Sequence, residues 1–330
     1  MSKTTACSVK TMKVLIVKTS SMGDVLHTLP ALTDMRKAIP NLQVDWVVEE
    51  NFAEIPIWHY AVRKVIPVAI RRWRKNLCKR STWLEWQRFI KELKSEQYDA
   101  VIDAQGLIKS AVLVTRQAQG KKFGYNKQSA REGLSSLFYD VTFDIPYQQH
   151  AVERIRKLCA KSLAYPLVQN QGDYAIAQHF AKNQTKITAY IMLIHATTRA
   201  DKHWKESYWS EVIKSLAEQG LEVRLPWGNQ IEKERAERLA AVAENVIVLP
   251  RMTLTELAMQ IEGAQAVISV DTGLSHLTAA LDKLNVILYG ATDPKLIGAY
   301  GKNQHYLTSD KMDNILPTQV LKKLKTVIGK

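Results

Sequence analysis

Cysteine is scarce in this sequence, and long apolar runs are absent. The three cysteines, Cys7, Cys78 and Cys159, lie far apart and form no CxxC pair, which argues against a disulfide framework and a thiolate zinc site. No window approaches the roughly 20 apolar residues of a membrane-spanning helix, and the N-terminus lacks the apolar middle of a secretory signal. We therefore expect a cytoplasmic protein with reduced cysteines.

Several common active-site motifs are also missing. No GxGxxG follows a strand and no GxxxxGK[ST] occurs, which argues against a dinucleotide oxidoreductase and a P-loop NTPase. Neither D-x-D nor HExxH is present, so a metal-diphosphate site has no evident ligands. The eight histidines are scattered singly. We expect His27 and His195 to lie in the core or behind a site, and His276 alone to reach a ligand.

What the chain does contain is enough apolar sequence for two domains. It has 330 residues, 46% of them hydrophobic, which exceeds the usual size of one domain. Its 46 basic and 32 acidic residues give a net charge of +14. Such an excess favours a polyanionic partner, whether nucleic acid, anionic lipid or a phosphorylated substrate.

Short apolar runs alternate with helical patterns, which predicts an α/β fold with parallel sheets and crossover helices. The expected strands are 14–17, 44–48, 65–69, 100–103, 190–194, 222–225, 246–249, 266–270 and 286–289. The expected helices are 24–38, 81–97, 106–119, 205–219, 230–243, 254–262 and 273–281. Thr253 and Glu256 form a capping box, which marks the start of one helix.

The proline, glycine and polar residues of 163–174 interrupt this pattern, and we place the domain boundary there. The predicted division is a disordered extension at 1–11, an N-terminal domain at 12–165 and a C-terminal domain at 166–330.

The stretch "MKVLIVKTSSMGDVLHTLPAL" (12–32) reads as strand, turn and helix with a glycine at the turn. Such a turn usually holds a phosphate at the helix N-terminus. Here Asp24 follows the glycine, so an acid stands where an anion would bind. From these residues alone, the helix cap is the favoured reading of Asp24.

Two polar segments follow strands of the C-terminal half, where ligands of open α/β sheets bind. They are "LIHATTRADKHW" and "SVDTGLSHLTAAL". Thr197 and Thr198 offer hydroxyls, and Lys202 offers a compact charge that suits a diphosphate. Asp271, Thr272 and Gly273 open a helix whose free amides can hold a phosphate. Capping by Asp271 and Thr272, with a solvated Lys202, is about as plausible for either segment alone.

The basic residues concentrate in "IRRWRKNLCKR" (70–80), which follows the strand at 65–69. Arginine mixed with tryptophan suits lipid interfaces and single-stranded nucleic acid. A solvated loop is the simpler reading of such a run. Trp83 and Trp86 share helical spacing with Ile90 and Leu93, so we expect these two tryptophans to pack against the domain.

Four segments in order, "KTSSMGDVLHTLPAL", "DAQGLIKSA", "HATTRADKHW" and "SVDTGLSHLTAAL...YGATDP", closely resemble the heptosyltransferases of lipopolysaccharide inner-core synthesis. The resemblance runs from Met12 to near the C-terminus, and the arginine segment with "HATTRADKHW" favours the enzyme that adds the first heptose. It implies a GT-B architecture, two Rossmann-like domains facing a cleft. It also implies inverting, metal-independent transfer of L-glycero-D-manno-heptose from ADP-heptose to a Kdo residue of Kdo-lipid A, with no cofactor.

The resemblance also assigns roles to residues. It implies that Asp24 is the base that deprotonates the acceptor hydroxyl. The residues it implies for ADP-heptose are Thr197, Thr198, Lys202, Glu232, Met252, Asp271, Thr272, Gly273 and His276. Those it implies for the anionic acceptor are Arg71, Arg72, Arg74, Lys75 and, more weakly, Arg131. The protein is then expected to be a monomer on the cytoplasmic face of the inner membrane, with an anionic membrane surface and no nucleic acid as partner.

Two alternatives stay open at this stage. One is a related heptosyltransferase that acts on an already heptosylated core. The other is a non-enzymatic protein that binds nucleic acid or an anionic membrane, which the charge and tryptophans favour but the ordered motifs do not.

Overall fold

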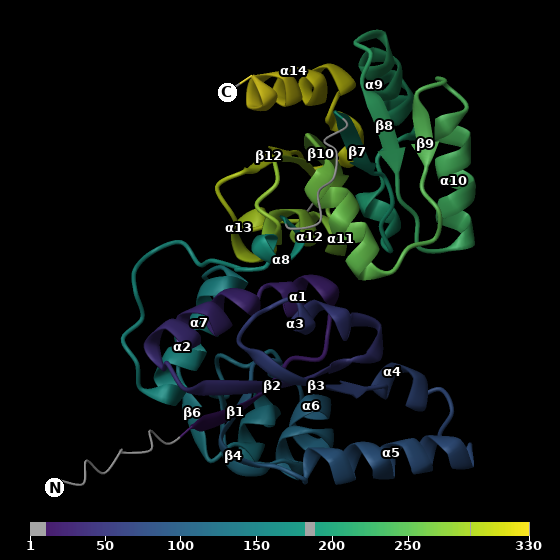
Figure 1. Ribbon diagram of the computed structural model, residues 1–330. Coiled ribbons are helices and arrows are strands. Elements are labelled where there is room, and N and C mark those ends of the chain that lie inside the picture. Colours follow the sequence, from purple (N-terminus) through teal and green to yellow (C-terminus); the bar gives the residue numbers. More distant parts are fainter. Residues whose placement is uncertain (1–10, 182–188, 291, 330) are drawn as a thin grey trace, which may run out of the picture. The chain divides into compact units, whose positions relative to one another are not determined.

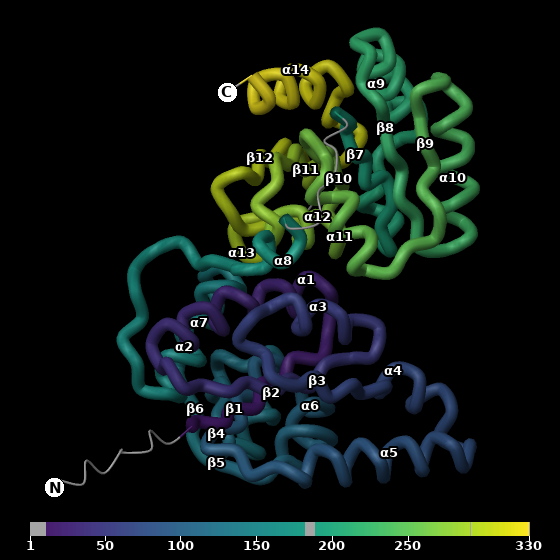
Figure 2. The backbone as a smooth tube through the Cα atoms, in the orientation of Figure 1, coloured from purple at the N-terminus to yellow at the C-terminus, as the bar shows by residue number. Residues whose placement is uncertain are grey.

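The structure is a computed structural model that describes residues 11–181, 189–290 and 292–329. Within these ranges the chain forms two compact units, each with one six-stranded parallel sheet (Figures 1 and 2). Among the described residues, unit 1 comprises 11–20, 28–148 and 152–173, and unit 2 comprises 21–27, 149–151 and the described residues from 174 onward. The predicted α/β class is confirmed. Residues 1–10 of the predicted extension lie outside the described residues.

The sheet of unit 1 has the strand order β3-β2-β1-β4-β5-β6. Its strands are β1 (Met12–Val17), β2 (Leu42–Glu49), β3 (Val62–Val68), β4 (Gln97–Asp103), β5 (Gln119–Tyr125) and β6 (Val141–Phe143). Central strands of parallel sheets are apolar at successive positions because helices cover both faces. Val14, Leu15, Ile16 and Val17 accordingly have no solvent exposure.

The helices of this part of the chain lie on both faces of the sheet. They are α1 (Met22–Leu26), α2 (Leu29–Ala38), α3 (Glu54–Ile57), α4 (Ile70–Trp73), α5 (Arg80–Leu93), α6 (Ile108–Leu113) and α7 (Ala151–Leu163). Figure 1 shows α5 and α6 on one face of the unit 1 sheet and α2 and α7 on the other. On the first face, Trp73, Phe89 and Leu93 pack against Leu15 and Val101.

The sheet of unit 2 repeats the same order, β12-β11-β10-β7-β8-β9. Its strands are β7 (Tyr190–Ile194), β8 (Glu222–Leu225), β9 (Val246–Val248), β10 (Ala266–Val270), β11 (Asn285–Tyr289) and β12 (Gln304–Thr308). Its helices are α8 (Ala177–Ala181), α9 (Glu206–Glu218), α10 (Gln230–Ala240), α11 (Leu254–Gly263), α12 (Gly273–Ala280), α13 (Pro294–Ile297) and α14 (Pro317–Ile328). Trp209 of α9, Leu239 of α10 and Val320 of α14 pack on one face of the sheet.

Every strand predicted from the sequence is present, but several elements were missed. The missed ones include the short or glycine- and lysine-interrupted strands β5, β6 and β12. They also include α7 and α14, although their buried residues recur at helical spacing, as Val152, Ile155 and Cys159 do in α7. The predicted helix 106–119 is wrong at its end, because α6 stops at Leu113 and β5 begins at Gln119. The predicted helix 81–97 likewise ends at Leu93, and β4 begins at Gln97. The capping box at Thr253 is confirmed, since the Thr253 amide donates to Oε2 of Glu256 over 2.8 Å.

The single helix predicted over 24–38 is also wrong, because the structure divides it into α1 and α2. Pro30 lies in the first turn of α2. Proline has no amide hydrogen, so it cannot donate to Leu26 and continue α1. The break lets α1 pack separately from α2, and α1 clusters with unit 2 while α2 belongs to unit 1.

No helix within the described ranges combines the length and apolarity that a bilayer crossing requires.

Candidate active site

In unit 2 the strand order reverses between β7 and β10, the place where open α/β sheets bind ligands. The two polar segments identified in the sequence follow these two strands, and the structure brings them together. The hydroxyl of Thr197 donates to the carbonyl of Asp271 over 3.2 Å. The ammonium of Lys202 lies 2.5 Å from Oδ2 of Asp271.

The alternative reading in which Lys202 is solvated is wrong. Its side chain is only 16% exposed and that of Asp271 only 7%. The ion pair fixes the lysine at the end of β10, because a partly buried charge needs a nearby counter-charge. Lys202 therefore points into the site rather than into solvent.

The helix α12 begins at this point. Thr272 is its N-cap residue and makes no side-chain capping hydrogen bond, and Gly273 is its first residue. Thr198 is exposed on the loop after β7. Uncapped amides at the first turn of a helix and an adjacent ammonium together favour an anionic ligand.

His276 lies one turn into α12 and is buried. Burial lowers the pKa of His276 to about 4, although the carboxylates of Asp271 and Asp24 act in the opposite direction. The imidazole is therefore neutral at pH 7 and can donate or accept a hydrogen bond without adding charge. His195, at the end of β7, is fully buried, and its pKa is lowered to about 4 for the same reason.

The short helix α1 packs on α12 through two glycines. A Cβ at Gly23 would lie 2.7 Å from Cδ2 of His276, and a Cβ at Gly273 would lie 2.7 Å from Sδ of Met22. Gly23 of α1 therefore lies against the His276 side chain of α12, and Gly273 of α12 lies against the Met22 side chain of α1. This contact was not predicted from the sequence, where a glycine in each of the two quoted motifs was the available signal.

Asp24 lies in the first turn of α1. Its Oδ2 accepts hydrogen bonds from the amide of Ser21 over 2.8 Å and from the Ser21 hydroxyl over 2.9 Å. Asp24 therefore caps its own helix, as one sequence reading predicted. His27, the C-cap residue of α1, packs edge-on against His276 with ring centroids 4.7 Å apart.

Two other predicted donor residues lie on neighbouring elements of unit 2. Glu232, in the first turn of α10, accepts from the Gly228 amide over 2.7 Å and from Nδ2 of Asn229 over 2.8 Å. Met252 is half-buried just before α11. The structure gives neither residue a direct contact with Asp271 or Lys202.

The corresponding strand ends of unit 1, β1 and β4, are joined by hydrogen bonds. The ammonium of Lys18 donates to the carbonyl of Ala104 over 2.9 Å, and Oε1 of Gln105 accepts from the Thr19 amide over 2.9 Å. Asp103 is fully buried and accepts from the Gln105 amide and from Thr115. Its carboxylate is therefore enclosed within unit 1 and bound to its own loop.

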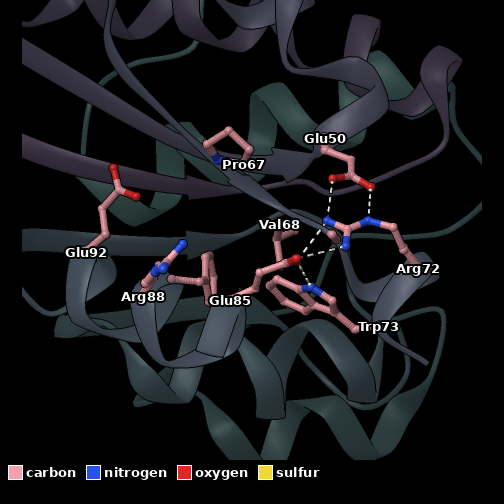
Figure 3. A pocket seen from close by; sticks show the side chains of 10 residues that line it. Glu50, Pro67, Val68, Arg72, Trp73, Glu85, Arg88 and Glu92 are labelled. Carbon is pink, nitrogen blue, oxygen red and sulfur yellow. Dashed lines mark hydrogen bonds and ion pairs between the residues drawn. The ribbon is translucent and has the colours of Figure 1, made fainter. Parts of the chain in front are cut away.

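A pocket of about 250 Å³ lies in unit 1 between β3, α4 and α5 (Figure 3). Its lining residues are Glu50, Pro67, Val68, Ala69, Arg72, Trp73, Glu85, Arg88, Phe89 and Glu92. Arg72 makes two hydrogen bonds of 3.0 Å with Glu50 and a 2.8 Å ion pair with Glu85. Glu85 also accepts from the Trp73 indole over 2.7 Å. These two donors lower the pKa of Glu85.

The other basic residues that were predicted to bind the acceptor make fewer polar contacts than Arg72. The Arg71 guanidinium lies 5.5 Å from the ring centroid of Phe52, and its amide donates to Glu49 over 3.0 Å. Arg74 and Lys75 are exposed, and among the described residues neither side chain has an ion-pair partner. Arg131 is exposed, and its amide lies near Gly106 in the loop after β4.

The predicted packing of two tryptophans is correct for one of them. Trp86 packs on Trp73 and Phe89, with ring centroids 5.8 and 5.7 Å away. Trp83 is 55% exposed. Its indole donates to the Leu77 carbonyl over 2.9 Å rather than packing in the core.

Comparison with known proteins identifies the class. Two Rossmann-like units of this strand order are the architecture of GT-B glycosyltransferases, and the model of glycosyltransferase family 9 (heptosyltransferase) matches residues 86–325. The chain belongs to this family and is a glycosyltransferase. This excludes the non-enzymatic binder among the alternatives.

Within the family, the chain belongs with the lipopolysaccharide heptosyltransferases. It is 57% identical over 319 residues to lipopolysaccharide heptosyltransferase 1 of Escherichia coli K12, covering 96% of this chain and 100% of that protein. It is 52% identical over 299 residues to the enzyme of the same name from Pseudomonas aeruginosa, covering 91% and 84%. The structure of E. coli heptosyltransferase WaaC with ADP has a TM-score of 0.94 at 56% identity, covering 96% and 100%.

Proposed function

We propose that this heptosyltransferase transfers L-glycero-D-manno-heptose from ADP-heptose to a Kdo residue of Kdo-lipid A, with inversion and without a metal ion. One observation carries the proposal. The chain is 55–56% identical to E. coli WaaC in structures with ADP and with ADP-2-deoxy-2-fluoro heptose, at TM-scores of 0.94 and 0.91. The relatives named lipopolysaccharide heptosyltransferase 1 support the choice of the first heptose over a later one.

Unit 2 is the proposed donor side, corresponding to the predicted domain 166–330. The free amides at Thr272 and Gly273 and the ammonium of Lys202 would bind the diphosphate. Thr197 and Thr198 would donate from the facing loop, while His276, Glu232 and Met252 would complete the pocket for the nucleotide sugar. Because Asp271 already holds Lys202 at 2.5 Å, the cation is positioned before the ligand arrives.

Asp24 is the proposed base. Its carboxylate would take the proton of the acceptor hydroxyl while the hydroxyl oxygen bonds to the anomeric carbon. The bond from that carbon to the diphosphate oxygen breaks at the same time, and ADP leaves with the electron pair. The hydrogen bonds from Ser21 to Oδ2 of Asp24 support this role, because they hold the carboxylate in one orientation.

Unit 1 is the proposed acceptor side, corresponding to the predicted domain 12–165. Arg71, Arg72, Arg74 and Lys75 would bind the carboxylates and phosphates of Kdo-lipid A, with Arg131 contributing from the loop beside Gly106. Arginine suits this task because its planar guanidinium binds carboxylate and phosphate groups through two parallel hydrogen bonds.

We further propose that the enzyme acts as a monomer on the cytoplasmic face of the inner membrane, where its acceptor is embedded, and that no cofactor or nucleic acid takes part. The net charge of +14 supports contact with an anionic surface.

The deciding experiment is an assay of ADP release with ADP-heptose and deacylated Kdo-lipid A, in the presence and absence of EDTA. We expect ADP release at the same rate in both conditions. We also expect a product whose anomeric configuration, measured by NMR, is opposite to that of the donor. No transfer to this acceptor would contradict the acceptor assignment. Loss of activity in EDTA, restored by a divalent cation, would contradict metal independence.

A further inference from the structure

Three large apolar side chains are exposed together where the α4–α5 loop meets α5. Leu77 is 56% exposed, Trp83 55% and Leu84 44%. The hydrogen bond from the Trp83 indole to the Leu77 carbonyl holds the first two next to each other. We call Leu77, Lys79, Arg80, Trp83 and Leu84 the corner patch.

The surroundings of the corner patch are strongly basic. Residues 71–80 contain six arginines and lysines and no acid. Along α5, the exposed side chains after Leu84 include Arg88 and Lys91. An exposed apolar cluster that is surrounded by positively charged side chains is suited to an anionic partner.

The acids of α5 are paired with cations rather than left beside the patch. Glu85 binds Arg72, and Glu92 forms a 3.0 Å ion pair with Lys64 of β3. Both line the pocket between β3, α4 and α5 (Figure 3). These pairs also neutralise Arg72 and Lys64. The other five basic residues of 71–80, Arg71, Arg74, Lys75, Lys79 and Arg80, have no ion-pair partner among the described residues.

A second exposed apolar site in unit 1 lacks this charge. Leu137 is 76% exposed, more than any member of the corner patch. Residues 131–140 around it contain one arginine, Arg131, and two acids, Glu132 and Asp140. Exposure alone would favour Leu137, whereas charge complementarity with an anionic surface favours the corner patch.

We propose that the corner patch docks the enzyme on an anionic lipid bilayer. Trp83 would lie at the headgroup level, where its amphipathic ring is favoured, with Leu77 and Leu84 among the upper acyl carbons. Lys79 and Arg80 would contact anionic headgroups. This inference rests on the proposed function, since an acceptor anchored in a membrane requires the enzyme to reach that surface.

The test is sedimentation of the full-length protein with vesicles of phosphatidylglycerol and phosphatidylethanolamine, and with vesicles of phosphatidylcholine. We expect binding to the anionic vesicles only, and its reversal by salt. The variant Lys79→Gln/Arg80→Gln should bind roughly 30-fold more weakly, since each basic residue near such a surface contributes about fivefold in affinity. The variant Leu77→Ser/Leu84→Ser should bind at least about tenfold more weakly, because two apolar side chains no longer enter the acyl region. Leu137→Ser is the matched control and should bind like wild type.

Activity on two acceptors separates this proposal from the proposed function. With deacylated acceptor in solution, the corner variants should transfer at the wild-type rate and melt at the wild-type temperature. With acceptor in vesicles, they should be slower. If no variant transfers to either acceptor and wild type also fails, the proposed function is wrong, and the vesicle binding still tests the patch.

Three results would overturn the proposal: unchanged vesicle binding in both corner variants, equal loss of binding in Leu137→Ser, or equal binding of wild type to phosphatidylcholine. Binding to single-stranded DNA that the corner variants lose, without vesicle binding, would assign the patch to nucleic acid instead.

Discussion

The imidazole of His276 lies directly against the backbone of Gly23, so that a Cβ at position 23 would be 2.7 Å from its Cδ2. The contact joins α1, which carries Asp24, to α12, which begins beside Asp271. Direct packing at Gly23 therefore couples the positions of two predicted site residues of unit 2. They are the predicted base Asp24 and the predicted donor ligand His276. No side chain other than hydrogen fits there without movement.

We expect Gly23→Ala to lower stability by about 1–3 kcal/mol, because the added methyl overpacks the α1–α12 contact. Transfer should fall as well, since α1 must shift together with Asp24. Thermal unfolding and ADP release measure the two effects. The double variant Gly23→Ala/His276→Ala removes the obstructing ring and should recover melting temperature but not activity. Additive losses in the double variant would show that the two residues do not interact.

Asp24→Asn should reduce the transfer rate by about 10² to 10⁴, the usual value of a positioned base. The fold should survive, because the asparagine oxygen can still accept from the Ser21 amide. ADP-heptose affinity, measured by calorimetry, should stay close to wild type. Ser21→Ala is the control, as it removes one hydrogen bond to Asp24 but keeps the carboxylate. A folded Asp24→Asn enzyme with normal turnover would exclude Asp24 as the base.

Lys202→Met should weaken ADP-heptose binding and also destabilise the protein by about 1–3 kcal/mol, because Asp271 then stays buried without a counter-charge. The second effect follows from the ion pair and contradicts the simple expectation for an exposed lysine. Lys202→Met/Asp271→Asn should restore the melting temperature while ADP-heptose binding stays weak. Tight donor binding by the folded single variant would reject the diphosphate role.

We expect substitutions of Arg72 and Arg74 to have different effects on stability, although both residues were predicted from the sequence to bind the acceptor. Arg74→Ala should raise the acceptor KM with no change in melting temperature, since no described residue pairs with its side chain. Arg72→Ala should raise the acceptor KM and also cost about 1 kcal/mol of stability, because Glu50 and Glu85 lose their shared partner. The donor KM should be unchanged in both. Equal increases in both KM values would assign this segment a structural role.

The sequence predicted the strands and the polar strand ends because buried parallel strands are continuous apolar runs, as in 14–17 and 266–270. It could not predict that α1 leaves α2 and packs on α12, since this depends on contacts between residues about 250 positions apart. Nor could it distinguish Trp83 from Trp86. Both fit one helical period, and only the path of the α4–α5 loop decides which one faces the core.

The ion-pair partners of the charged site residues could not be predicted from the sequence either. The pairing of Lys202 with Asp271, and of Arg72 with Glu50, arises where separate strands end at one sheet edge, and Glu85 reaches Arg72 from helix α5. Residue type indicated that these side chains could bind an anion, but only the structure shows that each already has a carboxylate partner. The predicted roles of Asp24 and of the donor and acceptor residues remain predictions.

Acid should destabilise unit 1 through His59. This histidine is buried, its Nδ1 accepts from the Ala61 amide over 3.1 Å, and its Nε2 lies 3.0 Å from the Thr33 hydroxyl. Burial lowers the pKa of His59 to about 4 from the ordinary 6.5, although Asp173 acts in the opposite direction. Between pH 6.5 and 4 the unfolded chain therefore binds a proton that the folded protein does not. Stability is fully present above pH 6.5 and is lost as the pH falls through this window, by about 3 kcal/mol in total.

We expect His59→Gln to be less stable than wild type at pH 7, because it loses part of this hydrogen-bonded packing, but to lose less stability between pH 7 and 4.5. Urea unfolding at several pH values measures the slope directly. His179→Gln is the matched control, since His179 is exposed on α8, and its slope should equal that of wild type. A residual slope is expected in His59→Gln, because His195 and His276 are also buried and have pKa values lowered to about 4. An unchanged slope in His59→Gln would mean that His59 is already protonated in the folded protein or is equally uncharged in both states.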